Sequence, residues 1–102
     1  MRQAGGAALR VVVRLAAALR PHAGGASSVH LDLDPPVTLA AVIDAVAAAH
    51  PAVGRRVRDE AGRLRSHVNL FVGPDNARDL DDTDTVVPAG AEVTVLPAVS
   101  GG

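Results

Sequence analysis

Hydrophobic and polar residues alternate along three stretches of the chain, and this period of two predicts β-strands. The first two stretches, 9–16 and 28–34, are separated by residues 20–25, whose proline and glycines predict a loop. Two alternating stretches joined by a glycine-rich loop are typical of a β-hairpin. The hydrophobic positions that we expect to face inward in this hairpin are Leu9, Val11, Val13, Leu15, Val29, Leu31 and Leu33.

One segment has helical rather than alternating spacing. Thr38 precedes it and belongs to a residue type that caps helix N-termini. Pro51 follows it, and we expect the helix to end there because the residue before a proline avoids helical backbone angles. Residues 52–66 mix charged and hydrophobic side chains and predict a short helical turn and a loop. The hydrophobic residues at helical spacing are Leu39, Val42, Ile43 and Val46.

The second half of the chain predicts the remaining strands. Residues 68–72 alternate as a third strand, a very short strand is expected at 77–80, and the last strand spans 92–96. The order is therefore β-β-α-β-(β)-β, which predicts an α+β fold with a mixed sheet and one main helix. One amphipathic helix covers only one face of a sheet, so we expect the other face to be partly exposed.

Two large hydrophobic residues are expected on this helix-free face. Phe71 is out of phase with its buried neighbours in the third strand, and Leu96 is out of phase with Val93 and Val95. Exposed hydrophobic residues on an open sheet face are typical of a docking surface for another protein. Alternatively, the segment 52–66 folds over this face and buries Phe71.

The composition limits the classes of protein that the chain can belong to. Its 102 residues form one small domain, 48% of them hydrophobic and 21% charged, with no cysteine, tryptophan or tyrosine. A net charge of −1 and a single aromatic residue give no basis for binding nucleic acid or a membrane. Arg10 and Arg14 interrupt the apolar residues near the N-terminus, which does not fit a signal peptide, so we expect a cytoplasmic protein.

The chain lacks the patterns that usually mark an enzyme's active site. No glycine-rich phosphate loop or nucleophile motif occurs, and the histidines have no metal-ligand spacing, so we expect neither a metal nor another cofactor bound by the chain. The acidic run has two interpretations, a surface that steers a basic partner or a solvated turn. The histidines are His22, His30, His50 and His67, and the acidic run contains Asp79, Asp81, Asp82 and Asp84.

The end of the chain carries the candidate chemistry. Pro97 cannot donate a hydrogen bond to a sheet, so strand pairing should fade there. Gly101 and Gly102 have no Cβ, so an extended backbone could enter a channel that larger residues would block. The carboxylate of Gly102 could attack the α-phosphate of ATP, and a sulfur nucleophile could then displace AMP from the acyl-adenylate. Alternatively, these residues are a frayed terminus.

Three motifs together resemble the MoaD/ThiS family of ubiquitin-like sulfur carriers. They are Leu19–Gly25, His67–Val72 and Glu92–Gly102, and the first of them is most similar to the CysO-type branch. The resemblance implies a β-grasp domain over residues 9–97, a flexible segment at 1–8 and a flexible diglycine tail at 98–102. It also implies a carrier that acts with partner enzymes and is not itself an enzyme.

What the resemblance implies for the site centres on Gly102. Similar proteins convert this terminal glycine to an adenylate and then to a thiocarboxylate, with Ser100 and Gly101 forming the slim approach. The activating partner would be an E1-like adenylyltransferase and sulfurtransferase that uses ATP and magnesium, and the sulfur would arrive as a persulfide on another protein. The residues that would dock on the partners are Phe71, Leu96, Pro97 and Val99.

The acceptor of the sulfur is left open by the sequence. By branch resemblance, a sulfur-accepting synthase would add the sulfur to an activated serine on the route to cysteine. A molybdopterin precursor, the thiazole of thiamin and a thio-containing secondary metabolite are alternatives. The chain could instead be a ubiquitin-like modifier of other proteins, or a binding subunit whose tail only completes a partner's active site.

The chain departs from the family pattern at two turns. Asp82 stands where similar proteins often have a glycine, and Gly90 is followed by Ala91 where an aspartate is common. We expect these differences to affect loop geometry and the fit to partners more than the chemistry at Gly102.

Overall fold

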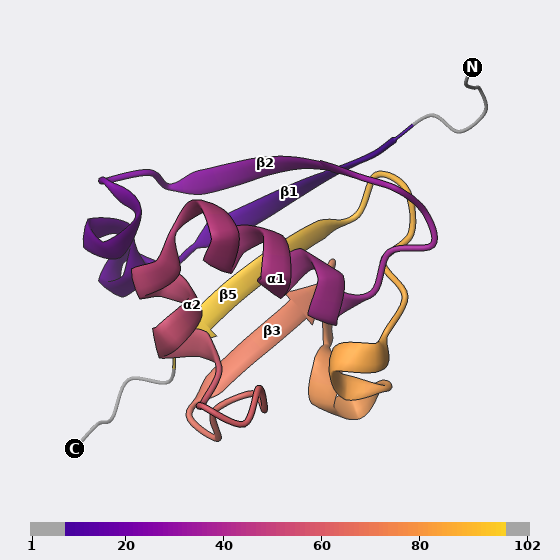
Figure 1. The fold of residues 1–102 in the computed structure, drawn as a ribbon. Helices are drawn as coiled ribbons and strands as arrows, with labels where there is room; N and C mark the ends of the chain where they lie inside the picture. The colour runs from indigo at the N-terminus through magenta and orange to yellow at the C-terminus, as the bar shows by residue number, and fades with distance from the viewer. Residues whose placement is uncertain (1–7, 98–102) are drawn as a thin grey trace.

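The computed structural model describes residues 8–97 as a five-stranded mixed sheet with two α-helices on one face (Figure 1). The strands lie in the order β2-β1-β5-β3-β4 across the sheet. Neither α-helix is long and apolar enough to cross a membrane. The elements in chain order are β1 (Leu9–Leu15), the 3₁₀ helix η1 (Ala17–Ala23), β2 (Ser28–Leu33), α1 (Leu39–Ala49), α2 (Pro51–Val57), β3 (Val68–Val72), β4 (Asp75–Asn76), the 3₁₀ helices η2 (Ala77–Asp79) and η3 (Asp82–Asp84), and β5 (Glu92–Pro97).

The predicted N-terminal hairpin is confirmed. Strands β1 and β2 pair antiparallel from Leu9 opposite Leu33 to Arg14 opposite Ser28. The connection between them is not the predicted loop throughout, because residues 17–23 form η1. Its backbone turns even though Pro21, which has no amide hydrogen, lies inside it.

The predicted main helix is also confirmed, and its cap is the expected one. The hydroxyl oxygen of Thr38 accepts a hydrogen bond from the amide of Ala41 at 3.2 Å. Pro51, however, does more than end this helix. It is the first residue of α2, where a proline is well accommodated because the first amides of a helix have no helical acceptor.

The short strand of the second half lies earlier than expected. We predicted it at 77–80, whereas β4 comprises Asp75 and Asn76, and residues 77–79 form η2. The side chain of Asn76 accepts a hydrogen bond from the amide of Arg78 at 3.0 Å, which caps η2 and ends the strand. In the next turn, Asp82 has a φ of 54°, the left-handed conformation that explains why a glycine suits this position.

The strands meet around β5, which is the middle strand of the sheet. It pairs parallel with β1 and antiparallel with β3, and its last pair joins Pro97 to Val68. This topology is the β-grasp arrangement of a mixed sheet with one main helix across it, as the sequence predicts. The core between sheet and helices contains Val11, Val13, Leu15, Leu39, Val42, Ile43, Val46, Val53, Val57, Val68, Leu70, Val93 and Val95, all buried.

Gly54 allows α2 to pack closely on α1. A Cβ placed at this position would lie 2.5 Å from the Cβ of Ala47 and 3.0 Å from its Cα, and both distances are too short for carbon atoms. Gly54 is buried, and its neighbours Val53 and Val57 enter the core. The absence of a side chain therefore sets how near the second helix lies to the first.

We predict that Gly54→Ala destabilises the fold by about 1–2 kcal/mol, because overpacking at the helix contact outweighs the better helix propensity of alanine. Chemical denaturation followed by circular dichroism measures this change. In an Ala47→Gly background the loss caused by Gly54→Ala should be smaller, since one of the two clashing methyl groups is gone. Ala48→Gly, at an exposed site of the same helix, gives the cost of a helical glycine alone. An equal loss in both backgrounds would rule out this explanation.

Candidate functional site

The candidate site is the segment of chain that follows β5. β5 is the middle strand, and its pairing with β1 ends at Val95, whereas its pairing with β3 continues to Pro97 opposite Val68. Of the residues predicted to act here, Leu96 and Pro97 are described by the structure. Val99, Ser100, Gly101 and Gly102 lie outside the described residues, and their roles stay predictions.

Phe71 and Leu96 both lie on the helix-free face, as their alternation predicts. The side chains of Leu70 and Val72 are buried toward the helices, so Phe71 between them points to the other face, where it is half-buried. Leu96 is 44% exposed. In the register of β3 and β5, Phe71 is opposite Thr94, so Leu96 is its diagonal neighbour. Their docking role remains a prediction.

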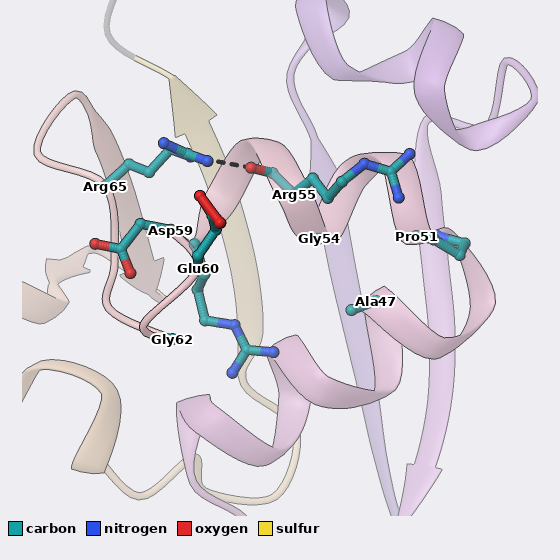
Figure 2. A pocket seen from close by; sticks show the side chains of 9 residues that line it. Ala47, Pro51, Gly54, Arg55, Asp59, Glu60, Gly62 and Arg65 are labelled. Carbon is teal, nitrogen blue, oxygen red and sulfur yellow. Dashed lines mark hydrogen bonds between the residues drawn. The ribbon is translucent and has the colours of Figure 1, made fainter.

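The segment 52–66 does not cover Phe71 in the way that we considered. Its first part forms α2, which packs on α1. Its next residues, including Asp59 and Gly62, line a hollow together with Ala47 of α1 (Figure 2). Both parts therefore lie on the helix side of the sheet, and the helix-free face is left uncovered by them.

Ion pairs flank the hydrophobic residues on the helix-free face. Arg14 lies 2.9 Å from the carboxylate of Glu92, across the parallel pair of β1 and β5. Arg10 lies 2.6 Å from Asp32, and its hydrogen bond lowers the pKa of the Asp32 carboxyl group. All four side chains are substantially exposed, so these pairs contribute little to stability and instead give this face a mixed charge around its apolar residues.

Beside the end of β5 the structure shows a hollow that sequence reasoning missed. Pro97 forms part of its wall, and the remaining walls come from η1, α2 and the residues just before β3. We call it the basic hollow, because every ionisable side chain that lines it is an arginine or a histidine. These side chains are His22, Arg55, Arg56, Arg65 and His67. They come from three separate parts of the sequence, so no local motif marks the site.

A second hollow lies between α1, α2 and the following loop, and its charges are mixed (Figure 2). Arg58 forms an ion pair with Asp44 at 2.8 Å. The carboxylate of Asp59 accepts hydrogen bonds from the amides of Arg63 and Ala61, each at 2.9 Å, and these bonds lower its pKa. These contacts shape the loop that leads to β3, and we assign this hollow a structural role.

Arg78 fixes the start of β3, next to the basic hollow. Its Nη2 atom donates to the carbonyl oxygens of Arg65 at 2.8 Å and Val68 at 2.7 Å, with a longer contact of 3.4 Å to that of Ser66. The positive charge on the guanidinium group strengthens these hydrogen bonds to the carbonyl groups. No sequence motif marks this role, since Arg78 stands beside the acidic run and away in sequence from the carbonyl groups that it contacts.

The other candidate groups do not come together. Within residues 8–97 the structure shows no cluster of three or more histidine and carboxylate side chains that could hold a metal ion. The acidic run occupies η2, η3 and the turns around them, and its aspartates are exposed. The amide of Asp81 donates to the hydroxyl of Thr85 at 3.0 Å, so this turn is ordered, and neither interpretation of its charge is decided.

Comparison with known proteins identifies several relatives. The sequence profile of the ThiS family matches residues 13–102. The sulfur carrier protein CysO of Mycobacterium tuberculosis is 36% identical over 96 residues, which cover 92% of this chain and 100% of that protein. The match to the family profile includes the residues beyond Pro97.

Solved structures agree with the sequence comparison. The crystal structure of SAMP1 from Haloferax volcanii superposes with a TM-score of 0.80 at 32% identity, covering 91% of this chain and 99% of that one. A CysO chain in the crystal structure of the BexX/CysO complex of Amycolatopsis orientalis is also similar. It gives a TM-score of 0.79 at 32% identity, with 90% of this chain and 99% of that chain covered. The relatives are named as carrier or modifier proteins and not as enzymes.

We predict that Arg78→Ala lowers the free energy of unfolding by about 1–3 kcal/mol, because the carbonyl of Val68 and its neighbours lose a charged donor. Denaturant unfolding measures the change, and amide hydrogen exchange in residues 65–68 should increase. Arg56→Ala is the control, since the side chain of Arg56 is exposed and makes no hydrogen bond in the described part of the chain. Equal stability of the two variants would contradict the role given to Arg78.

Proposed function

Since the chain belongs to the ThiS family, with relatives of the CysO type, we propose that it is a sulfur carrier whose terminal carboxylate at Gly102 becomes a thiocarboxylate. One observation carries this proposal: the family match continues through Gly101 and Gly102, directly after a strand that is anchored in the middle of the sheet. The chain has no cysteine, so its carboxyl end is the group left to hold sulfur.

The carrier supplies a presented carboxylate, and the partner enzymes supply the catalysis. In the activating enzyme, which we take to be of the E1-like type using ATP and magnesium, a carboxylate oxygen of Gly102 attacks the α-phosphorus and pyrophosphate leaves. A protein persulfide then attacks the acyl carbon, and AMP leaves. A thiol breaks the resulting sulfur–sulfur bond, which forms the thiocarboxylate on Gly102 and a disulfide on the delivering protein.

The position of Pro97 supports this division of labour. With β5 held by β1 as far as Val95 and by β3 as far as Pro97, the folded domain would remain outside while the five residues that follow could reach roughly 17 Å into a partner when extended. Val99, Ser100 and Gly101 would then occupy the approach to the active site. The glycines at the end keep this approach narrow.

The helix-free face is the proposed docking surface for these partners, with Phe71 and Leu96 at its centre and Pro97 at its edge. Its apolar residues lie next to the strand that leads to Gly102, so one contact could both hold the domain and aim the chain end. The similar CysO chain was crystallised in a complex with BexX, which supports a carrier that works by binding a second protein.

We propose an activated serine on a partner synthase as the acceptor, in a route to cysteine, because the CysO-type relatives are similar over nearly the whole chain. A molybdopterin precursor, the thiazole of thiamin and a thio-containing secondary metabolite are the competing acceptors. We place the reaction in the cytoplasm, where ATP is available to the activating enzyme.

A ubiquitin-like modifier is the second candidate, and it is favoured by the similarity to small archaeal modifier protein 1 of Haloferax volcanii, 35% identical over 78 residues. Such a modifier would form an amide bond between Gly102 and a lysine of another protein. Because the chain contains no lysine, it could not form chains on its own lysine side chains.

Intact mass spectrometry tests the carrier function directly. After incubation with ATP, magnesium, an activating enzyme of a ThiS-family carrier and a sulfide source, we expect the mass to rise by the difference between sulfur and oxygen. Deletion of Gly101 and Gly102 should abolish this gain, and Gly102→Ala should cripple it, while both variants keep the native circular dichroism spectrum. Adducts on other proteins without the gain would favour a modifier, and no change of either kind would favour a docking subunit.

The docking surface is tested by a matched pair of substitutions. Leu96→Asp should weaken binding to the activating enzyme by about tenfold or more, because a charge replaces an apolar contact at the interface centre. Leu80→Asp is the control, since Leu80 is 46% exposed, close to the 44% of Leu96, but follows η2 and belongs to neither β3 nor β5. Phe71→Asp should act in the same direction as Leu96→Asp. Unchanged affinity for both variants, measured by calorimetry, would exclude this face from the interface.

A further inference from the structure

The basic hollow is the feature of the molecule that the proposed carrier chemistry does not explain. Pro97, the last described residue of β5, lies in its wall. Any protein that receives the chain end must therefore bring its surface close to the hollow. The side chains that such a surface would meet first are those of Arg55 and Arg56, both exposed on α2.

The arginines of this hollow are not neutralised within the described part of the chain. Four other arginines, Arg10, Arg14, Arg58 and Arg63, form ion pairs with carboxylates. Between residues 8 and 97, Arg55, Arg56 and Arg65 form none. Arg65 contributes to the field that lowers the pKa of Asp59, but it lies beyond ion-pair distance from that carboxylate. In the described part of the chain, these three arginines thus keep guanidinium groups that no ion pair occupies, although Arg55 and Arg65 also line the second hollow with Asp59 and Glu60.

The positions of these arginines are set by the packed core. Val53 and Val57 bury the inner face of α2, and the contact between Gly54 and Ala47 fixes its distance from α1. The Nε atom of Arg65 donates to the carbonyl oxygen of Arg55 at 2.9 Å, which ties the loop before β3 to the helix (Figure 2). The charged groups are therefore held on a rigid frame around Pro97.

Five of the eleven acidic residues lie at the opposite end of the sheet. Strand β3 starts beside the basic hollow, and the acidic turns follow its other end (Figure 1). A net charge of −1 therefore conceals a partial separation of positive and negative charge, with Asp59 and Glu60 the carboxylates nearer the arginines. Such a separation orients a protein in the field of a charged partner and raises its association rate. The exposed aspartates at that end are Asp75, Asp79, Asp81, Asp82 and Asp84.

We propose that the basic hollow binds carboxylate side chains at the entrance of the partner's active site, so that the domain arrives with its C-terminal end forward. The proposal rests on the proposed function, because it needs a partner that takes in the residues after Pro97. Arg55 and Arg56 form the electrostatic contact. Arg65, which is held by its hydrogen bond to the carbonyl oxygen of Arg55, forms the inner wall. Guanidinium groups suit carboxylates because they can donate two parallel hydrogen bonds.

Charge reversal at matched sites tests the proposal through the kinetics of the activating enzyme. We expect Arg55→Glu and Arg56→Glu each to lower kcat/KM by about tenfold at low salt, with kcat at saturation unchanged and the difference shrinking at high salt. Arg63→Glu is the control, because it makes the same charge change on an exposed side chain outside the hollow. Equal values of kcat/KM for Arg56→Glu and Arg63→Glu would overturn the proposal.

Nuclear magnetic resonance titration gives a second measurement that does not depend on thiocarboxylate formation. A hexaglutamate peptide should shift the amide signals of residues 55, 56 and 65–67 in the native protein and in Arg63→Glu, and not in Arg56→Glu. If the native protein acquires no sulfur in the mass experiment, the proposed function fails and this titration alone decides the role of the hollow. Shifts confined to other regions, or equal shifts with inorganic phosphate at the same charge concentration, would overturn binding of a carboxylate-bearing partner.

Discussion

The parallel pairing of β1 with β5 is the contact on which the rest of this structure depends. It joins residues 80 positions apart in the chain, such as Val13 and Val93, and makes β5 the middle strand. Both of these valines are fully buried, so the pairing also forms the centre of the core beneath α1. Because β1 holds β5 as far as Val95 and β3 holds it as far as Pro97, the residues after Pro97 begin from a fixed point. The chemistry proposed at Gly102 would need such a fixed point.

Much of the fold could be predicted from the sequence because its strands and main helix follow simple periodic patterns. The alternation in 9–15 and 68–72 and the Thr38 cap required no knowledge of distant contacts. The predictions were wrong where the structure depends on such contacts or on local capping. Examples are η1, formed where proline and glycine suggested a loop, and β4, whose position is set by Asn76 capping the next turn.

The candidate site, too, could be predicted only in part from the sequence. The alternation of β3 and β5 was enough to place Phe71 and Leu96 on the helix-free face. The basic hollow could not be predicted, because its arginines and histidines come from η1, α2 and the residues before β3, which only the folded chain brings around Pro97. The role of Gly54 could not be predicted either, because it depends on the contact with Ala47 that only the folded chain forms. The apolar face and the basic hollow both border the end of β5 at Pro97, from which the chain continues toward Gly102.

The hydrogen bonds of Arg78 have a consequence for the behaviour of the protein in concentrated solution. Strand β4 pairs only with Phe71 and Val72, so the first half of β3 has no neighbouring strand on its outer side. An open strand edge of this kind invites another chain to add to the sheet, which is a common first step in aggregation. The guanidinium group of Arg78 donates a hydrogen bond to the carbonyl oxygen of Val68 at this edge. A single side chain thus blocks a hydrogen-bonding position that a strand from a second molecule would use.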